Sequence, residues 1–363
     1  MGFKNMKTNF TFADISLFNS MEKNRAIKRM EQINATVDWS RIESLLMRNY
    51  PVGKSFEGND AYPPLILMKC LLLQQWFKID SDPELETQIN DRISFKKFLG
   101  LSFDDPAPDH STFSRFRGRF SKDNMRMINH ELLSQFAAKG LTINEGIAID
   151  ARLVQSASHP LKSEKLEEEK LKKQTAEGKL DKNGKALKFA RDLESDWTVK
   201  NEVPHFGLKE HASVDTHYGF VLATEMTPAS HHDSPYLPLC VAGSCHTKEP
   251  VKKVFADKGY FGKPNREFLS MNKIEDGIMR KATKGTELTE YETERNKAIS
   301  KVRYIVEQYF GLSHLYNRAY RARFPKLIET FAQRHIPSVI KNQTIFLKFF
   351  YCEAHKFHFE RLF

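Results

Sequence analysis

Residues 146–154 read Gly-Ile-Ala-Ile-Asp-Ala-Arg-Leu-Val, and the interpretation of the whole chain starts from this stretch. A short β-branched run after a glycine predicts a buried β-strand rather than a helix. Asp150 interrupts the run, and a carboxylate in a buried strand needs a metal ion, a cation or hydrogen bonds to offset its lost hydration. Taken alone, Asp150 is more simply read as a structural aspartate that ends the strand and caps a turn. The case for chemistry therefore depends on residues further along the chain.

Composition narrows the class of protein before any further motif is considered. The chain has 363 residues, 40% of them hydrophobic, which suits two or three packed domains of roughly 100–200 residues each. Its formal net charge of +10 favours a polyanionic partner, DNA or RNA first and an acidic membrane surface second. The most apolar segment, 64–77, is too short for the ~20 residues that span a bilayer, so no membrane-spanning helix is expected; DNA rather than a membrane is the expected partner. The four cysteines form no CxxC pair, which indicates reduced thiols in a cytoplasmic protein.

Residues 59–143 predict a small domain of three helices. The first, 64–77, is apolar on nearly every face and is therefore expected in the core. The second runs over 82–100, from a capped start with a first-turn proline to a glycine stop signal. Before this domain, only one amphipathic segment, 37–46, is predicted.

The third predicted helix, after residue 108, has two distinct faces. Phe113, Phe116 and Phe120 lie three and four residues apart and form an apolar face. Arg115 and Arg119 lie four apart on another face, near the start of the helix. Such a helix suits contact with DNA phosphates or the major groove. An ordinary solvated basic face explains the spacing equally well.

From Gly146 onward the pattern changes to that of strands. Strands are predicted at 147–150, 153–157 and 277–279, with a hairpin formed by 211–215 and 219–226. A further short strand, 253–257, also ends in an aspartate, Asp257. The polar tract 162–194 is predicted as a loop with solvated helical pieces. A long helix is predicted over 288–312, and Glu307 lies beside its buried stripe.

Asp150, Asp257 and Glu307 form the constellation that carries chemistry. Three carboxylates on core elements can hold two divalent cations, and hard cations such as Mg²⁺ prefer oxygen ligands. Such a pair activates a water or a 3′-hydroxyl and stabilises the leaving oxygen of an in-line phosphoryl transfer. The order strand-Asp, strand-Asp, helix-Glu on alternating β and α elements is that of an RNase H-like catalytic core.

With these residues in place, the sequence resembles a bacterial insertion-sequence transposase of the DDE type, in the group of insertion-sequence families four and five. The resemblance covers about residues 60–335. It rests on seven motifs in a fixed order, which read Ser-Asp-Pro-Glu-Leu-Glu at 81–86 with Asp-Arg-Ile-Ser-Phe at 91–95, Pro-Asp-His-Ser-Thr-Phe-Ser-Arg-Phe-Arg at 108–117, Ala-Ile-Asp-Ala at 148–151, His-Phe-Gly-Leu-Lys-Glu-His at 205–211, Thr-Pro-Ala-Ser-His-His-Asp-Ser at 227–234, Ala-Asp-Lys-Gly-Tyr at 256–260 and Arg-Tyr-Ile-Val-Glu at 303–307.

The resemblance implies a metal-dependent reaction on DNA. Asp150, Asp257 and Glu307 would be the catalytic residues and would ligate two Mg²⁺ ions, with Mn²⁺ as a substitute. The enzyme would bind the terminal inverted repeats of double-stranded DNA, hydrolyse DNA at the element ends and transfer the freed 3′-hydroxyls to target DNA. A homodimer or higher assembly on DNA in the bacterial nucleoid is expected.

The resemblance also names residues that would contact DNA. The family's helix motif is Y-x2-R-x3-E-x6-K, in which Arg303 and Glu307 fit, while Ser300 replaces the tyrosine and His314 the lysine. Arg303 would contact a phosphate or orient Glu307, although an ordinary i,i+4 salt bridge also fits the spacing. Solvated surface residues are the alternative for most of the group. The residues expected to contact DNA are Arg115, Arg117, Arg119, Lys209, Arg303, His314 and Arg321.

The predicted organisation is an α/β protein with an N-terminal helical part. Residues 1–58 form an N-terminal segment, and 59–143 form a helical, helix-turn-helix-like DNA-binding domain. Residues 144–335 form an RNase H-like catalytic domain, a mixed β-sheet flanked by helices, with a charged loop at 161–196. An aromatic-rich extension, 336–363, completes the chain. Two other functions stay open at this point: an RNase H-like nuclease or resolvase, and an inactive DNA-binding protein derived from a transposase.

Overall fold

The computed structural model of the chain describes most residues from 3 to 342. The described residues are 3–4, 10–21, 23–53, 60–119, 121–141, 143, 145–176, 179, 192–246, 249–283, 285–317, 319–322 and 341–342. The aromatic-rich extension predicted at 336–363 lies outside these residues, apart from two positions.

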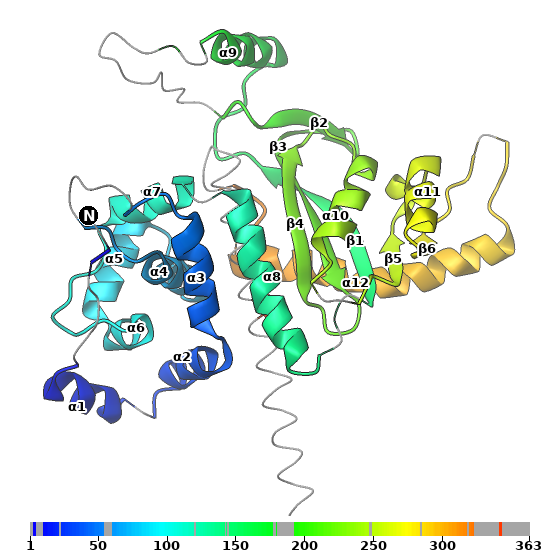
Figure 1. Cartoon of the computed structure of the whole chain (residues 1–363). Coiled ribbons are helices and arrows are strands. Elements are labelled where there is room, and N and C mark those ends of the chain that lie inside the picture. Colours follow the sequence, from blue (N-terminus) through cyan, green and yellow to red (C-terminus); the bar gives the residue numbers. More distant parts are fainter. Residues whose placement is uncertain are drawn as a thin grey trace, which may run out of the picture.

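Eight described helices precede the first strand of the sheet and form a helical region (Figure 1). Only α4 to α8 fall in the segment predicted as three helices, and α1 and α2 were not predicted from the sequence. The helices are α1 (Phe12–Ser20), α2 (Arg25–Thr36), α3 (Trp39–Asn49), α4 (Pro64–Trp76), α5 (Asp82–Asp91), α6 (Ile93–Leu99), α7 (His110–Arg119) and α8 (Lys122–Ala138).

The apolar pattern explains how this region packs. Helix α4 is the predicted core helix, and its Leu71, Leu72 and Leu73 are almost completely buried. The helix predicted over 82–100 is divided in two, because Arg92 adopts an extended backbone that ends α5 and begins α6. Gly100 then ends α6 in the left-handed conformation, with φ of 74°, as the stop signal predicted.

The second part of the chain is a six-stranded mixed β-sheet. The strand order is β2-β3-β1-β5-β6, with β4 paired to β3. Strand β1 runs antiparallel to β3 and parallel to β5, and β5 runs parallel to β6. This confirms the predicted fold class, a helical region followed by a mixed sheet flanked by helices. The strands are β1 (Gly146–Gln155), β2 (Asp196–Lys200), β3 (Val203–Asp215), β4 (Val221–Pro228), β5 (Lys253–Ala256) and β6 (Glu275–Ile278).

Several local predictions are corrected by the sheet. The two strands predicted at 147–150 and 153–157 are one continuous strand, β1, because nearly its whole length pairs with β3. The tract predicted as a loop at 162–194 contains the helix α9 (Ser163–Thr175). The hairpin is confirmed as β3 and β4, and Gly219 supplies the turn with φ of 80°.

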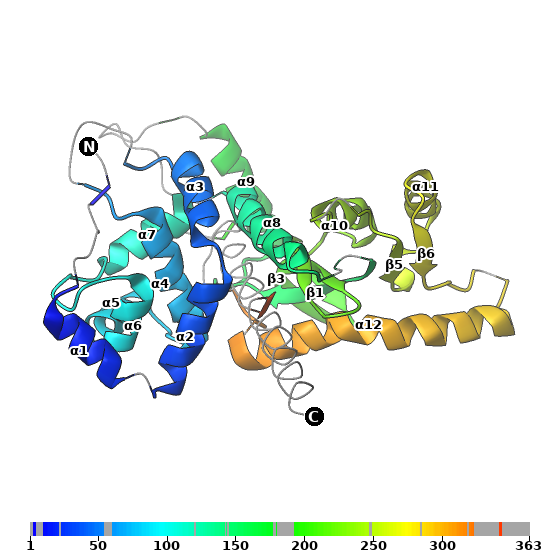
Figure 2. The ribbon, with the colours of Figure 1, turned by 60° about the horizontal axis from the view of Figure 1, so that its bottom comes forward.

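Helices cover both faces of the sheet (Figures 1 and 2). One face carries α8 and α10 (Leu237–Gly243), and α12 (Glu290–Asn317) lies across the other face. Val306 and Tyr309 of α12 pack on Ala148, Ala212 and Val214 of the sheet. Helix α11 (Lys263–Met271) lies beside β6, and two 3-10 turns, η1 (Ser234–Tyr236) and η2 (Lys258–Tyr260), complete the described elements.

The helical region is joined to the sheet through α8. Lys122 and Arg126 of α8 both form ion pairs with Glu225 of β4, and the Lys122–Glu225 distance is 2.7 Å. The Asn129 side chain donates to the backbone carbonyls of Val221 and Leu222. These contacts hold α8 against the sheet on the face opposite α12. Among the described helices, none has the length and apolarity that crossing a membrane requires.

Candidate active site

Asp150 and Asp257 lie side by side because of the register of two parallel strands. Ile149 of β1 pairs with Ala256 of β5, and an aspartate follows each of them directly. Side chains alternate between the faces of a sheet. Ala148 and Phe255, two positions earlier, pack against α12, so both aspartates belong to the face that α12 covers.

Arg303 connects this pair to Glu307. Its Nη2 lies 2.8 Å from Oδ2 of Asp150 and 3.9 Å from Oε1 of Glu307, one turn further along α12. The Arg303 residue is only 7% exposed, whereas the Glu307 side chain is 53% exposed. Arg303 therefore contacts Asp150 more closely than Glu307. The Arg303–Glu307 pair, which the i,i+4 spacing predicts, is present at the longer distance.

Asp150 has an unusual electrostatic environment. Burial raises its pKa from 3.8 to about 6, the negative charges of Asp257 and Glu307 act in the same direction, and Arg303 opposes them. Asp257 and Glu307 thus act on Asp150 through their charge, although the three carboxylates do not form a group whose oxygens all lie within 4.8 Å of one another. Their oxygens are the ligands that hard divalent cations prefer, and a cation would relieve their repulsion. The donor set therefore fits the expected metal.

A buried network stands behind these carboxylates. Arg152, two residues after Asp150, donates from Nε and Nη2 to Oε2 of Glu210, at 2.9 and 2.7 Å. Its Nη1 donates to the carbonyl of Phe310, at 3.0 Å, and the Tyr309 hydroxyl donates to Oε1 of Glu210, at 2.9 Å. Strands β1 and β3 and helix α12 are joined at this point.

This network was not predicted from the sequence, although a signal for it existed. Arg152 belongs to the strand stretch 146–154 and Glu210 to the motif at 205–211, and each is two positions from a residue on the covered face of the sheet. Because side chains alternate along a strand, Arg152 and Glu210 are expected on that same face. A buried charge there is destabilising unless it has a partner of opposite charge, so the two residues could have been paired from the sequence.

The residues predicted to contact DNA differ in their exposure. Arg115 and Arg119 are exposed on α7. Arg117 is 2% exposed and forms an ion pair with Asp82 of α5, so the expectation that it contacts DNA is not kept. Lys209 also forms an ion pair, 2.8 Å from Asp233, and its side chain is 14% exposed.

The two remaining basic candidates lie near the C-terminal end of α12. His314 is exposed, and its ring lies near that of Tyr320, with centroids 5.2 Å apart. Arg321 donates from Nε to the carbonyl of Ser156 at 3.1 Å and from Nη2 to that of Ala157 at 3.2 Å. Both residues thus lie near the C-terminal ends of α12 and β1, further along each element than Glu307 and Arg152.

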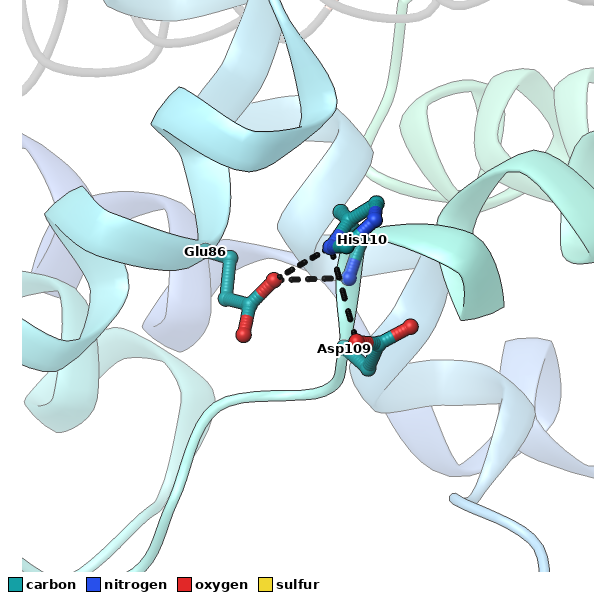
Figure 3. A group of neighbouring side chains, drawn as sticks. All are labelled: Glu86, Asp109 and His110. Atoms are coloured by element: carbon teal, nitrogen blue, oxygen red, sulfur yellow. Dashed lines mark hydrogen bonds and ion pairs between the residues drawn. The ribbon is translucent and has the colours of Figure 1, made fainter.

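A separate acidic group occurs in the helical region (Figure 3). Within the described residues, Glu86, Asp109 and His110 form the group of possible ligands whose atoms all lie within 4.8 Å of one another. Glu86 Oε2 accepts from the backbone N–H and from the ring of His110, both at 2.9 Å, which raises the pKa of His110. Asp109 accepts from the N–H of Ser111. These bonds explain the group as a cap at the start of α7, and it is not the predicted triad.

Carboxylates on neighbouring strands and on the covering helix can together hold divalent cations, the arrangement that nucleases and polymerases use for phosphoryl transfer. The chain matches two protein families, described as "Transposase domain (DUF772)" over residues 18–119 and "Transposase DDE domain" over residues 143–327. The second match spans half of the chain, and the protein belongs to the DDE transposase family.

Relatives agree with this assignment. The chain is 33% identical over 235 residues to the "Transposase for insertion sequence element IS1106" of Neisseria meningitidis serogroup B, a match covering 63% of this chain and 76% of that protein. The sequence-based prediction of an insertion-sequence transposase is thereby confirmed. Among solved structures, the chain resembles a piggyBac transposase synaptic complex with hairpin DNA, with a TM-score of 0.41 and 11% identity over 92% of this chain and 74% of that one.

Proposed function

We infer that Asp150, Asp257 and Glu307 are the metal-binding catalytic triad of this transposase. The observation that carries the inference is the β1–β5 register, which sets Asp150 beside Asp257 on the face covered by α12. Arg303 supports it, because a buried guanidinium already compensates the charge of Asp150 and approaches Glu307. Two Mg²⁺ ions held by these oxygens, or Mn²⁺ in their place, would activate the attacking hydroxyl and stabilise the leaving oxygen.

The residues of the chain then have distinct tasks in the reaction. Asp150 provides a carboxylate from β1, Asp257 provides one directly after β5, and Glu307 provides one from a helix joined to the strands by the Arg152–Phe310 and Tyr309–Glu210 hydrogen bonds. Arg303 keeps Asp150 oriented toward Glu307. Fixed ligands on strands and helices hold reacting groups more accurately than loops do. The reaction that this site would catalyse is cleavage at the element ends, followed by joining of the 3′-hydroxyl ends to target DNA.

DNA recognition is assigned to the helical region and to the exposed end of α12. Arg115 and Arg119 are exposed on α7, whereas Arg117 is buried in an ion pair with Asp82. The partner would be double-stranded DNA, both the terminal inverted repeats and the target. A dimer or higher assembly on DNA in the nucleoid completes the proposal.

The test is cleavage of DNA that carries the ends of the element, by purified full-length protein with Mg²⁺. Asp257→Ala is expected to abolish cleavage and to retain DNA binding, because the carboxylate would hold the metal needed at the reacting phosphate and would not contact the rest of the duplex. A matched control is Glu267→Ala, an exposed carboxylate on α11 that should leave cleavage unchanged. Full cleavage by Asp257→Ala would refute the triad. Cleavage by the unmodified protein without joining would instead favour a nuclease or resolvase.

A further inference from the structure

A large groove begins where the proposed active site ends. Its volume is about 1070 Å³, and its walls come from the last part of β1, the first part of β3 and the C-terminal end of α12. Arg152, two residues after Asp150, lines it, and so does Phe310, three residues after Glu307. Because these lining residues follow Asp150 in β1 and Glu307 in α12, the groove runs from the triad along β1 and α12 toward their C-terminal ends.

The lining of the groove combines aromatic rings with basic groups. Trp197 and Phe206 pack together on one wall, with ring centroids 5.3 Å apart, and Tyr320 and His314 form a second ring pair. Arg321 also lines the groove. None of the lining residues within the described part of the chain is acidic. An acid-free wall beside three catalytic carboxylates favours an anionic occupant.

Tyr320 is held in place by backbone hydrogen bonds. The chain after α12 returns to the end of β1, where the N–H of Gln155 donates to the carbonyl of Tyr320 at 2.8 Å. The N–H of Ala322 donates to the carbonyl of Gln155 at 2.7 Å. Despite this fixed backbone, the Tyr320 residue stays 49% exposed. A half-exposed ring on a fixed backbone is a preformed stacking surface.

We propose that this groove receives an unpaired segment of the DNA strand that passes the catalytic carboxylates. Aromatic rings that stack bases, in a groove with basic and no described acidic lining residues, suit single-stranded nucleic acid with little dependence on sequence. The groove is close in volume to a pocket for a small ligand, which suits a few stacked nucleotides better than a duplex. The proposal rests on the proposed function, because the triad defines where the strand runs.

The experiment measures binding by full-length protein without divalent metal, so that no cleavage is needed. Two probes are compared: a blunt duplex, and the same duplex with an unpaired tail of about 10 nucleotides that contains the fluorescent base 2-aminopurine. The protein should prefer the tailed duplex and quench the 2-aminopurine. Tyr320→Ala should weaken binding of the tailed duplex about tenfold and leave the blunt duplex unchanged. His314→Ala should act in the same direction with a smaller effect.

Two further variants make the result specific. Tyr320→Phe keeps the ring and should bind the tail like the unmodified protein. Tyr304→Ala removes a tyrosine of α12 that is 62% exposed and does not line the groove, and it should change neither probe.

Equal affinity for both probes, or unchanged tail binding by Tyr320→Ala, would overturn the proposal. A lowered melting temperature of Tyr320→Ala with unchanged tail binding would also overturn it, since that result means that Tyr320 contributes to the stability of the fold and not to DNA binding. Failure of the proposed function is recognised separately: if the unmodified protein binds the tail but never cuts with Mg²⁺, the triad fails and the groove stands.

Discussion

The guanidinium of Arg303 lies 2.8 Å from the carboxylate of Asp150, although 153 positions separate the two residues in the chain. The contact exists because α12 packs across β1 and places its buried stripe over the middle of that strand, where Ala148 and Asp150 lie. The same guanidinium lies 3.9 Å from Glu307, so one cation approaches two of the three proposed ligands. Arg303 therefore partly offsets the charge that a bound metal would also neutralise.

Arg303→Gln should lower cleavage strongly. The variant removes a buried positive charge, so the carboxylate of Asp150 loses the contact that orients it, and its pKa should rise further. A hydrogen bond between charged groups contributes about 1.5–3 kcal/mol, which corresponds to a loss of about 10–100-fold in the cleavage rate if the contact persists in the transition state. The measurement is single-turnover cleavage of end-containing DNA with saturating Mg²⁺.

Arg303→Lys is the informative companion to that variant. Lysine keeps the charge without the planar fork, so it should recover part of the lost rate. Arg266, a surface arginine on α11, provides the control Arg266→Gln, for which no change in rate is expected. If Arg303→Gln cleaves at the unmodified rate, Arg303 has no part in the site.

Glu210→Gln should destabilise the fold more than Tyr309→Phe. Glu210 is fully buried, and its loss leaves the guanidinium of Arg152 without its carboxylate, at a cost of about 3–5 kcal/mol in the free energy of unfolding. Tyr309→Phe removes one hydrogen bond to a charged group and should cost about 1.5–3 kcal/mol. Urea denaturation of both variants measures the difference.

A double variant separates the ion pair from simple packing. Arg152→Met combined with Glu210→Gln removes both charges and should recover most of the stability that Glu210→Gln loses, since no unpaired charge stays buried. If the double variant is as unstable as the sum of both single variants, the two residues do not act as a pair.

The strands that carry Asp150 and precede Asp257 were predictable because their signals are local. Ile147 to Asp150 and Lys253 to Asp257 are short apolar runs that each end in an aspartate, and such runs identify core strands without knowledge of their partners. Their adjacency was not predictable, because the parallel register of β1 with β5 is set by residues about a hundred positions apart. Only the order along the chain suggested that the two strand ends meet.

Arg117 shows why residue roles were harder to predict than elements. It lies between two arginines that stay exposed, and the sequence gives it the same basic character. Its burial depends on α5, which brings Asp82 against α7, so the difference is a tertiary effect. The break at Arg92 is similar, because the apolar periodicity continues through it while the backbone does not.

Arg115 and Arg119 should weaken duplex binding when both are changed to glutamine. Each phosphate contact releases about one counterion, so loss of both should reduce the slope of log affinity against log salt concentration by about 2. Fluorescence anisotropy with an end-containing duplex over a range of salt concentrations measures this slope. Arg41→Gln on α3, where the side chain is 67% exposed, is the control. An unchanged slope in the double variant would place the DNA on another face of the protein.

Lys69→Met should stabilise the helical region at neutral pH, because burial of this lysine on α4 opposes its charge. Burial lowers the pKa of Lys69 from 10.5 to about 8, even though its Nζ lies 4.6 Å from the Trp39 ring and bonds Asn34. Below pH 8 the ammonium is charged in both states, and the folded state bears the cost, about 1–3 kcal/mol after allowance for the ring contacts.

The gain from Lys69→Met should therefore depend on pH in one direction. As pH rises from about 8 toward 10.5, the folded state releases the proton before the unfolded state does, so the unmodified protein loses its penalty and the advantage of methionine shrinks. Urea denaturation at pH 7 and at pH 9.5 measures both values. Lys78→Met removes an exposed lysine just after the same helix. Its effect on the free energy of unfolding should be about the same at pH 7 and at pH 9.5. If the stability gain of Lys69→Met stays constant or grows from pH 7 to pH 9.5, the charge of the buried Lys69 ammonium does not destabilise the folded state.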